Sequence, residues 1–251
     1  MALGFASLYS NISGDQNIAI GMETCRDNTS GFGNIGIGLE ASRINTTGNN
    51  NVAIGNFTLY NNVSGSNNTA LGHQADVSSG NITNSTALGN GAIADQSNKV
   101  RIGNDNVTII EGFVAMTVAS DRRYKEDIAT IPLGLDFINQ LHPVEYIKKT
   151  NSEKTKEWGL IAQELKETLD KVNYKNAAII SSDKSKDKFL SIRYTDLFAP
   201  IIKSIQELSE SDKKTEILQK TVAAQETKII ELNTKLEALE KKLNSLISTS
   251  K

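Results

Sequence analysis

The 251-residue sequence has few of the residues that cross-link a chain or bury it in a membrane. Cys25 is the only cysteine, so an intrachain disulfide is excluded, and we interpret this thiol as a small packing residue. No apolar run approaches the roughly 18 residues that a bilayer span needs. We predict no metal site, no cofactor and no membrane span.

An excess of charge of either sign is also absent. Lysine and arginine together number 27 against 29 aspartates and glutamates, which gives a formal net charge of -2. Without a basic excess the chain lacks the electrostatic footprint of a nucleic-acid-binding protein, and we predict no nucleic-acid partner. Residues Met1 to Phe5 show neither the charged n-region nor the long h-region of a secretory signal.

Lysine and proline are nearly missing from the first half of the chain. Lys99 is the only lysine before Lys125, and the three prolines all follow residue 120. The first half is instead rich in asparagine and glycine, whereas the second half is charged. This change of composition predicts at least two domains that meet near residue 120.

The first half is a tandem repeat of 17 residues. The glycine that ends a triplet of a small residue, Ile or Leu, and Gly recurs at this interval at Gly4, Gly21, Gly38, Gly55, Gly72 and Gly89. Asparagine keeps the same interval at Asn17, Asn34, Asn51 and Asn68. The period predicts a stacked repeat domain over residues 1–104, similar to a β-roll or β-prism, in which single units cannot bury a face alone and chains associate.

Each unit contains one short strand and turns. Apolar residues alternate, as in Ile18 and Ile20, which predicts a strand whose apolar side is buried while the small residue between them faces the other way. Segments such as Asn28 to Gly31 predict turns, because glycine and asparagine tolerate positive φ. We interpret the Asn-x-Ser/Thr triplets as this turn chemistry, with glycosylation as the alternative. Glu23 and Glu40 follow the period and are interpreted as a solvated ladder.

The pattern changes after Gly89. The next glycine, Gly103, comes after 14 residues, and apolar stretches then predict two strands of a neck, at 107–110 and 113–118 within residues 105–119. Beyond Ile128 the pattern is typical of an α+β domain. We expect helices at 133–141 and 160–169, and strands at 144–148, 177–180 and 189–192, the last two around a charged Ser/Asp/Lys turn.

A long helix is expected from Thr195. Over residues 211–251 its apolar residues alternate spacings of four and three, which predicts a coiled coil rather than an ordinary amphipathic helix. Aliphatic residues at both seam positions are compatible with a trimer, and the polar Gln225 is a candidate for fixing the register. The seam consists of Leu218, Val222, Gln225, Ile229, Leu232, Leu236, Leu239, Leu243 and Leu246.

Four motifs of the second half agree with one known family in order and spacing. They are Ser120-Asp121 with Arg123, Lys125 and Ile128; Leu141 to Val144 with Tyr146; Trp158 to Leu165; and Arg193 to Leu208. Over residues 118–210 the chain resembles the endosialidase-type C-terminal intramolecular chaperone. That family of serine-lysine self-cleaving domains ends many phage tail spikes and fibres and some cellular surface proteins. The 17-residue repeats resemble the trimeric head repeats of bacterial adhesins and phage fibres.

The resemblance implies a homotrimer, in a virion tail fibre or spike or on an extracellular cell surface, with a self-cleaving chaperone at residues 120–210. Carried over to this sequence, Ser120 is the nucleophile and Lys125 its base, and Asp121 and Arg123 support them. The bond that is cut flanks Ser120, toward either Ala119 or Asp121. The motif from Gly159 to Glu164 is either structural or part of the site.

The chemistry of the residues themselves adds conditions to this assignment. A lysine accepts a proton from serine near neutral pH only when burial or neighbouring positive charge lowers its pKa, and Arg122 and Arg123 are candidates for that charge. Attack of the Ser120 hydroxyl on the carbonyl of Ala119 passes through a five-membered ring, which favours the Ala119–Ser120 bond.

Two alternatives remain. The chain could be an uncleaved structural trimer with a permanent coiled-coil anchor, or the repeats could bind a host-surface receptor or glycan. The repeat is already in progress at Ala2, which fits a fragment of a longer fibre or a short natural form.

Overall fold

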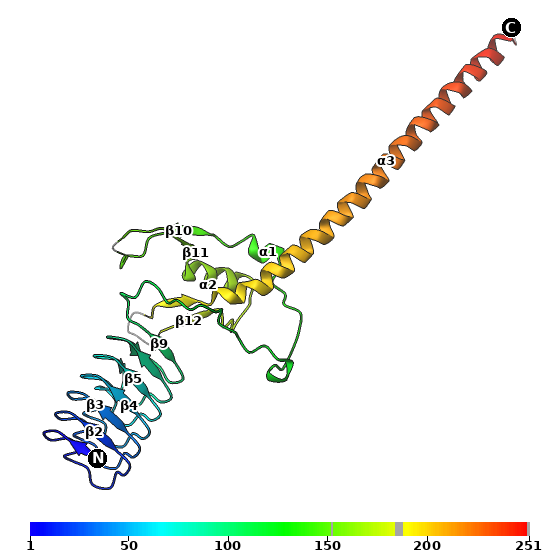
Figure 1. The fold of residues 1–251 in the computed structure, drawn as a ribbon. Coiled ribbons are helices and arrows are strands. Elements are labelled where there is room, and N and C mark those ends of the chain that lie inside the picture. The colour runs from blue at the N-terminus through cyan, green and yellow to red at the C-terminus, as the bar shows by residue number, and fades with distance from the viewer. Residues whose placement is uncertain (152, 184–187, 250–251) are drawn as a thin grey trace. The chain divides into compact units, whose positions relative to one another are not determined.

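The computed structural model describes residues 1–151, 153–183 and 188–249 (Figure 1). The chain divides into two compact units. The first comprises Met1–Ser120, Pro143–Gln163 and Ile180–Ile192, and the second comprises Asp121–His142, Glu164–Ile179 and Arg193–Lys251. Going along the chain, the first change from one unit to the other falls at the Ser120–Asp121 bond.

The repeats form a β-solenoid of about six turns. Seven strands make one parallel sheet, in the order β1 (Ala2–Leu3), β2 (Ile18–Ile20), β3 (Ile35–Ile37), β4 (Val52–Ile54), β5 (Thr69–Leu71), β7 (Thr86–Leu88) and β9 (Val100–Ile102). Paired residues lie one period apart, as Ala19 pairs with Gly36 and Gly36 with Ala53. The last step joins Ala87 to Arg101, which matches the shorter interval in the sequence. A second sheet consists of β6 (Asp76–Val77) and β8 (Ile93–Ala94).

The strands of the seven-stranded sheet face opposite to the prediction. The small central residue points into the coil, as at Ala19, Ala53 and Ala70, which are fully buried, whereas Leu71 beside Ala70 is 45% exposed. A larger side chain does not fit at this central position, because even a Cβ on Gly36 would lie 2.6 Å from Thr24 Cγ2 and 2.8 Å from Cys25 Sγ. The larger aliphatic residues therefore point outward.

Buried asparagine side chains form two ladders in the solenoid interior. In the first, each Asn Nδ2 donates to a carbonyl of the next coil, and each Oδ1 accepts the backbone N–H one period later; Asn51 donates to Gly65 O at 2.8 Å and accepts from Asn68 N at 3.0 Å. In the second, Asn28, Asn45 and Asn62 bond to one another and to turn carbonyls. These three residues are buried, so the turn interpretation holds and a glycan cannot be attached to them in this fold.

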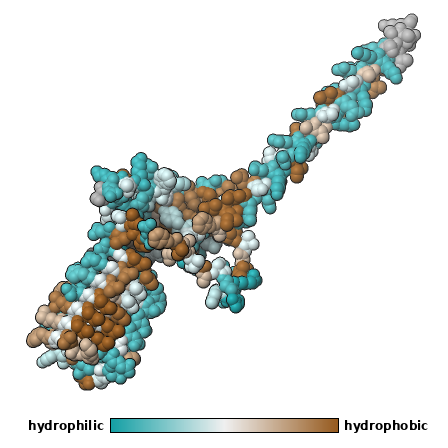
Figure 2. Space-filling view, viewed as in Figure 1, coloured by the Kyte–Doolittle hydropathy of each residue, from teal (hydrophilic) through white to brown (hydrophobic). Residues whose placement is uncertain are grey.

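The outward aliphatic residues form a continuous row that we call the apolar ladder. Because neighbouring strands pair in register, equivalent residues of successive coils lie side by side. Figure 2 shows apolar side chains gathered on the solenoid over these strands. The apolar ladder consists of Leu3, Ile20, Ile37, Ile54, Leu71, Leu88 and Ile102.

The neck strands predicted at 107–110 and 113–118 are not formed in the single chain. Residues 105–130 are exposed throughout and contain one short 3-10 helix, η1 (Arg122–Tyr124). Phe113 and Met116 are almost completely open to solvent. A strand needs a neighbouring strand for its backbone hydrogen bonds, and none of the strand pairs among the described residues involves this segment.

Two antiparallel hairpins complete the first unit. β10 (Val144–Tyr146) pairs with β11 (Glu157–Gly159), which the sequence did not predict, and β12 (Ile180–Ser182) pairs with β13 (Leu190–Ile192). The charged turn expected between β12 and β13 falls largely on residues 184–187, which lie outside the described residues.

In the second unit the short helix α1 (Leu135–Ile138) packs against the start of a long one. The unit also contains α2 (Ala162–Lys171) and η2 (Tyr194–Leu197), and its buried apolar residues are Leu133, Phe137, Leu165, Leu169, Ile179 and Leu197. α3 (Phe198–Thr249) runs without a break through the polar stretch 209–214. The seam from Leu218 to Leu243 lies fully exposed along it, and the side chain of Leu246 lies outside the described residues.

Candidate functional site

The predicted cleavage site lies where the first unit gives way to the second. Ser120 is the last residue before this boundary, and the chain after it turns into η1. Asp121 caps this short helix, because its Oδ1 accepts the backbone N–H of Arg123 at 2.8 Å. The backbone N–H of Lys125 closes the helix by donating to Arg122 O at 3.0 Å.

Asp121 and Arg123, the two residues expected to play supporting roles, form an ion pair. Arg123 Nη2 lies 2.8 Å from Asp121 Oδ2, and Arg123 Nε lies 3.0 Å from Oδ1. The hydrogen bond from the Arg123 side chain, and then that from its backbone N–H, lower the pKa of Asp121, and the same side-chain bond raises the pKa of Arg123. Because its charge is balanced by Asp121, Arg123 adds little net positive charge to this segment.

Ser120 and Lys125 are both exposed in the single chain. They fall on opposite sides of the boundary between the two units. The burial that would make a lysine a good proton acceptor is not supplied by residues 105–130, all of which face solvent.

The other motifs of the second half have structural partners. Glu164 of the Gly159–Glu164 motif lies 3.1 Å from His142 Nδ1, so two motifs meet there, and His142 itself lies in a loop. Gly159 itself pairs with Val144 in the β10–β11 hairpin. In the same hairpin the exposed Trp158 donates from Nε1 to Glu145 Oε2 at 3.2 Å.

One connection in the second unit was missed from the sequence. Glu207, on the first turns of α3, accepts the backbone N–H of Leu135 at 2.7 Å and so caps the N-terminus of α1. Gly134 leaves the room that this approach needs, because a Cβ there would clash with the Glu207 carboxylate. The bond from Leu135, followed by that from Lys203, lowers the pKa of Glu207. Only the tertiary fold brings together residues so far apart in the sequence.

Among the described residues, no group of three or more histidine, cysteine, aspartate or glutamate side chains is placed to hold a metal ion. Within the same residues no helix is long and apolar enough to cross a membrane.

Comparison with known proteins identifies one part of the chain. Residues 120–174 match a family model described as chaperone of endosialidase. The match begins at Ser120 and covers η1, α1, the β10–β11 hairpin and α2. No curated protein and no solved structure matches the chain.

Proposed function

Because residues 120–174 belong to the endosialidase-type chaperone family, we propose that this chain is part of a homotrimeric fibre, spike or surface adhesin whose C-terminal half guides trimer folding and then releases itself by autoproteolysis at Ser120. Such a protein works in a virion tail or on an extracellular cell surface. The family match, which starts at Ser120, is the observation that carries the proposal.

Three exposed apolar surfaces support association of identical chains. The apolar ladder runs the length of the solenoid, the segment 107–118 exposes Phe113 and Met116, and the seam of α3 exposes a leucine at nearly every turn. Contiguous exposed apolar surface on this scale marks an interaction site. A second and third copy of the chain would cover each surface with its equivalent.

The segment 105–119 is the part of the chain with most to gain from the trimer. Its alternating apolar residues are typical of strands, yet the single chain gives them no neighbour. In a trimer the equivalent segments of three chains can pair with one another, as the predicted neck requires. Folding of this segment therefore depends on assembly.

The dependence on trimer assembly would also control when the chain cuts itself. For cleavage at the Ala119–Ser120 bond, Ser120 Oγ attacks the carbonyl carbon of Ala119 while Lys125 accepts the hydroxyl proton. Protonated Lys125 then gives this proton to the peptide nitrogen of Ser120, which leaves as an amine, and water hydrolyses the resulting ester to a carboxylate at Ala119 and a free Ser120 hydroxyl. Lys125 is exposed in the single chain, and burial by the neighbouring chains would make it an effective base. Cleavage then reports that the trimer has formed, and loss of the registering domain leaves the trimer kinetically trapped.

Intact mass spectrometry of the purified chain tests the proposal. The parent should give two fragments that meet at Ser120, and their masses decide between the bonds to Ala119 and to Asp121. Ser120→Ala and Lys125→Ala should each remain whole. Thr117→Ala and Lys149→Ala, which alter an exposed hydroxyl and an exposed amine elsewhere, should be cut like the parent. Cleavage that persists in Lys125→Ala would exclude the dyad.

The uncleaved structural trimer is the competing account. It shares the apolar surfaces and the coiled-coil seam but predicts a full-length parent mass together with a trimer in light scattering.

A further inference from the structure

One flank of the solenoid departs from its own repeat. At one position of the 17-residue unit the residues are Glu23, Glu40, Phe57 and Gln74, and three residues further on they are Arg26, Arg43, Tyr60 and Val77. In the first two of these coils the pattern gives ion pairs, with Arg26 Nη1 2.9 Å from Glu23 Oε2 and Arg43 Nη1 2.9 Å from Glu40 Oε2. In the third coil both charges are replaced by aromatic rings.

The departures converge on one place. Phe57 and Tyr60 contact edge to face with centroids 6.4 Å apart, and the His73 ring also lies edge to face with Phe57, with centroids 6.1 Å apart. In the next coil an aspartate, Asp76, takes the interior position that Leu59 holds one period earlier. In the coil after that, Gly91 stands where the earlier coils have a side chain.

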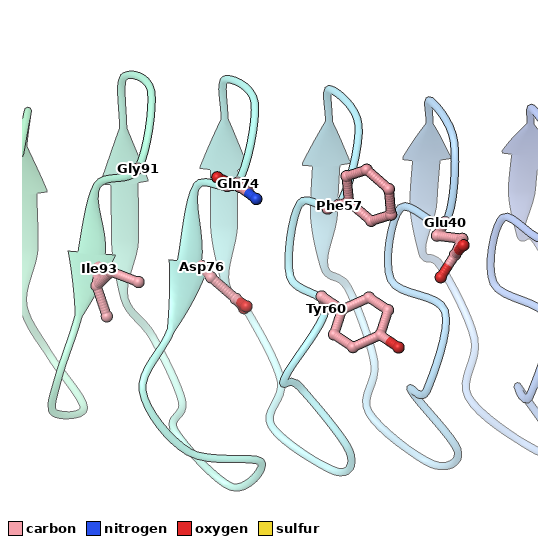
Figure 3. A pocket seen from close by; sticks show the side chains of 7 residues that line it. All are labelled: Glu40, Phe57, Tyr60, Gln74, Asp76, Gly91 and Ile93. Atoms are coloured by element: carbon pink, nitrogen blue, oxygen red, sulfur yellow. The ribbon is translucent and has the colours of Figure 1, made fainter.

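Together these changes open a hollow of about 560 Å³, within the size range of small-molecule sites. Figure 3 shows Phe57, Tyr60, Gln74 and Asp76 side by side on this flank, with Glu40 beyond the rings. The hollow adjoins β6 and β8, whereas the apolar ladder belongs to the seven-stranded sheet. A trimer that covers the apolar ladder therefore need not cover the hollow.

The polar groups of the hollow are held in place. Asp76 is only 5% exposed, and its carboxylate accepts the backbone N–H of Val77 at 2.8 Å and that of Asn61 at 3.1 Å. A carboxylate has about four acceptor positions, so it can take further donors from a ligand. Burial raises the pKa of Asp76 to about 7, so this group also carries a proton for part of the time near neutral pH.

The charge balance selects the class of ligand. No lysine or arginine is among the residues that line the hollow in the described chain, which disfavours an anion. Glu40 is paired with Arg43, which also contacts Glu23 at 3.0 Å and donates to the Tyr60 hydroxyl at 3.1 Å, and a carboxylate that is already paired disfavours a cation. A neutral sugar ring fits this lining, because its apolar C–H face can pack on the aromatic rings and its hydroxyl groups can bond to the carboxylates and the Gln74 amide.

We propose that the hollow lined by Glu40, Phe57, Tyr60, Gln74 and Asp76 binds a neutral pyranose unit of a surface glycan. The inference does not depend on cleavage, because residues 1–119 keep the whole hollow on either side of that event. A fibre with this site would attach through a flank of its shaft to an uncharged polysaccharide.

Saturation-transfer NMR on the full chain tests the site. The probes are the methyl glycosides of glucose, galactose, mannose and N-acetylglucosamine, with N-acetylneuraminic acid and tetramethylammonium as anionic and cationic comparators. At least one neutral glycoside should receive saturation on its ring protons. Saturation of no neutral glycoside, or of tetramethylammonium alone, would overturn the proposal.

The repeat supplies matched controls. Tyr60→Ala should raise the Kd about tenfold, equivalent to about 1.4 kcal/mol, whereas Tyr9→Ala, which removes the ring at the same repeat position outside the hollow, should change nothing. Glu40→Gln, which preserves shape, should weaken binding, whereas Asp15→Asn, which neutralises an exposed carboxylate outside the hollow, should not. Equal effects within either pair would contradict the site. Circular dichroism checks that each variant is folded, and the result is independent of whether the chain cuts itself.

Discussion

Replacing Asn51 by alanine should destabilise the solenoid far more than a typical polar substitution. Asn51 is 1% exposed. Its Oδ1 is the acceptor for the buried N–H of Asn68, and its Nδ2 donates to Gly65 O at 2.8 Å and to Asn34 Oδ1 at 3.1 Å. Gly65 O keeps a second donor in Asn62, and Asn34 Oδ1 keeps the backbone N–H of residue 51, so only the Asn68 N–H is orphaned.

The magnitude follows from these contacts. The orphaned N–H of Asn68 costs about 2 kcal/mol, and the two lost hydrogen bonds from Asn51 Nδ2 cost about 1 kcal/mol each, which gives about 4 kcal/mol in total. Guanidinium unfolding followed by far-UV circular dichroism measures the loss in the free energy of unfolding, on a Ser120→Ala background that keeps the chain whole. Asn61→Ala is the control, because Asn61 is exposed and only its backbone N–H bonds Asp76. A loss for Asn51→Ala within about 1 kcal/mol of this control would refute the account of the ladder.

Three further outcomes are expected. Leu71→Lys, which places a charge on the apolar ladder, should convert the trimer to monomers in light scattering, whereas Ser30→Lys on a turn should leave it intact; a trimeric Leu71→Lys would contradict the interface. The raised pKa of Asp76, about 7 against 3.8, means that the native state binds this proton more tightly, so its stabilisation is present at low pH and is lost as pH rises through about 7. Asp76→Asn should remove that slope from the pH dependence of unfolding, and an unchanged slope would refute the assignment. The pKa of Glu207 is lowered in the folded state, so its effect on stability depends on pH in the opposite direction. The stability that it contributes is present above the pKa of the unfolded chain and is lost as the pH falls through the pKa of the folded chain. Glu207→Gln should speed hydrogen exchange at the amides of α1, and unchanged exchange would contradict the cap.

The period of the repeat was enough to predict the solenoid and its register, because one coil per 17 residues places equivalent residues side by side. It was not enough to predict which side of the strand is buried. Alternation of Ile and Ala was interpreted as an apolar interior, yet the central position of the strand has no space for isoleucine, as the close approach of Thr24 and Cys25 to Gly36 shows. The repeat of Asn17, Asn34, Asn51 and Asn68 was visible in the sequence, but their burial was not predicted, because their hydrogen-bond partners lie in other coils.

In the second half the elements were predicted better than their lengths. α2 and β10 were placed within a few residues, but α1 is shorter than the predicted 133–141, and β11 was missed because its short run offers little alternation. The expected neck strands show the general limit: alternation indicates that a segment can be a strand, and a partner decides whether it is one.

The candidate cleavage residues came from motifs, and their roles stay predictions. The sequence placed Ser120 at a composition boundary, and the first of the five changes between the two compact units falls at the Ser120–Asp121 bond. The ion pair of Asp121 with Arg123 was not predicted, and it changes the expected source of positive charge for Lys125. The hollow could have been found from the sequence by aligning the coils, since Phe57 and Tyr60 stand where the two preceding coils have the charged pairs Glu23 with Arg26 and Glu40 with Arg43.

Native mass spectrometry of the freshly purified parent chain would report self-cleavage and stoichiometry in one spectrum. We expect a trimer of the fragment that ends beside Ser120, together with the separated C-terminal fragment. A trimer of uncut chains that persists on storage would contradict self-cleavage and support the permanent coiled-coil anchor.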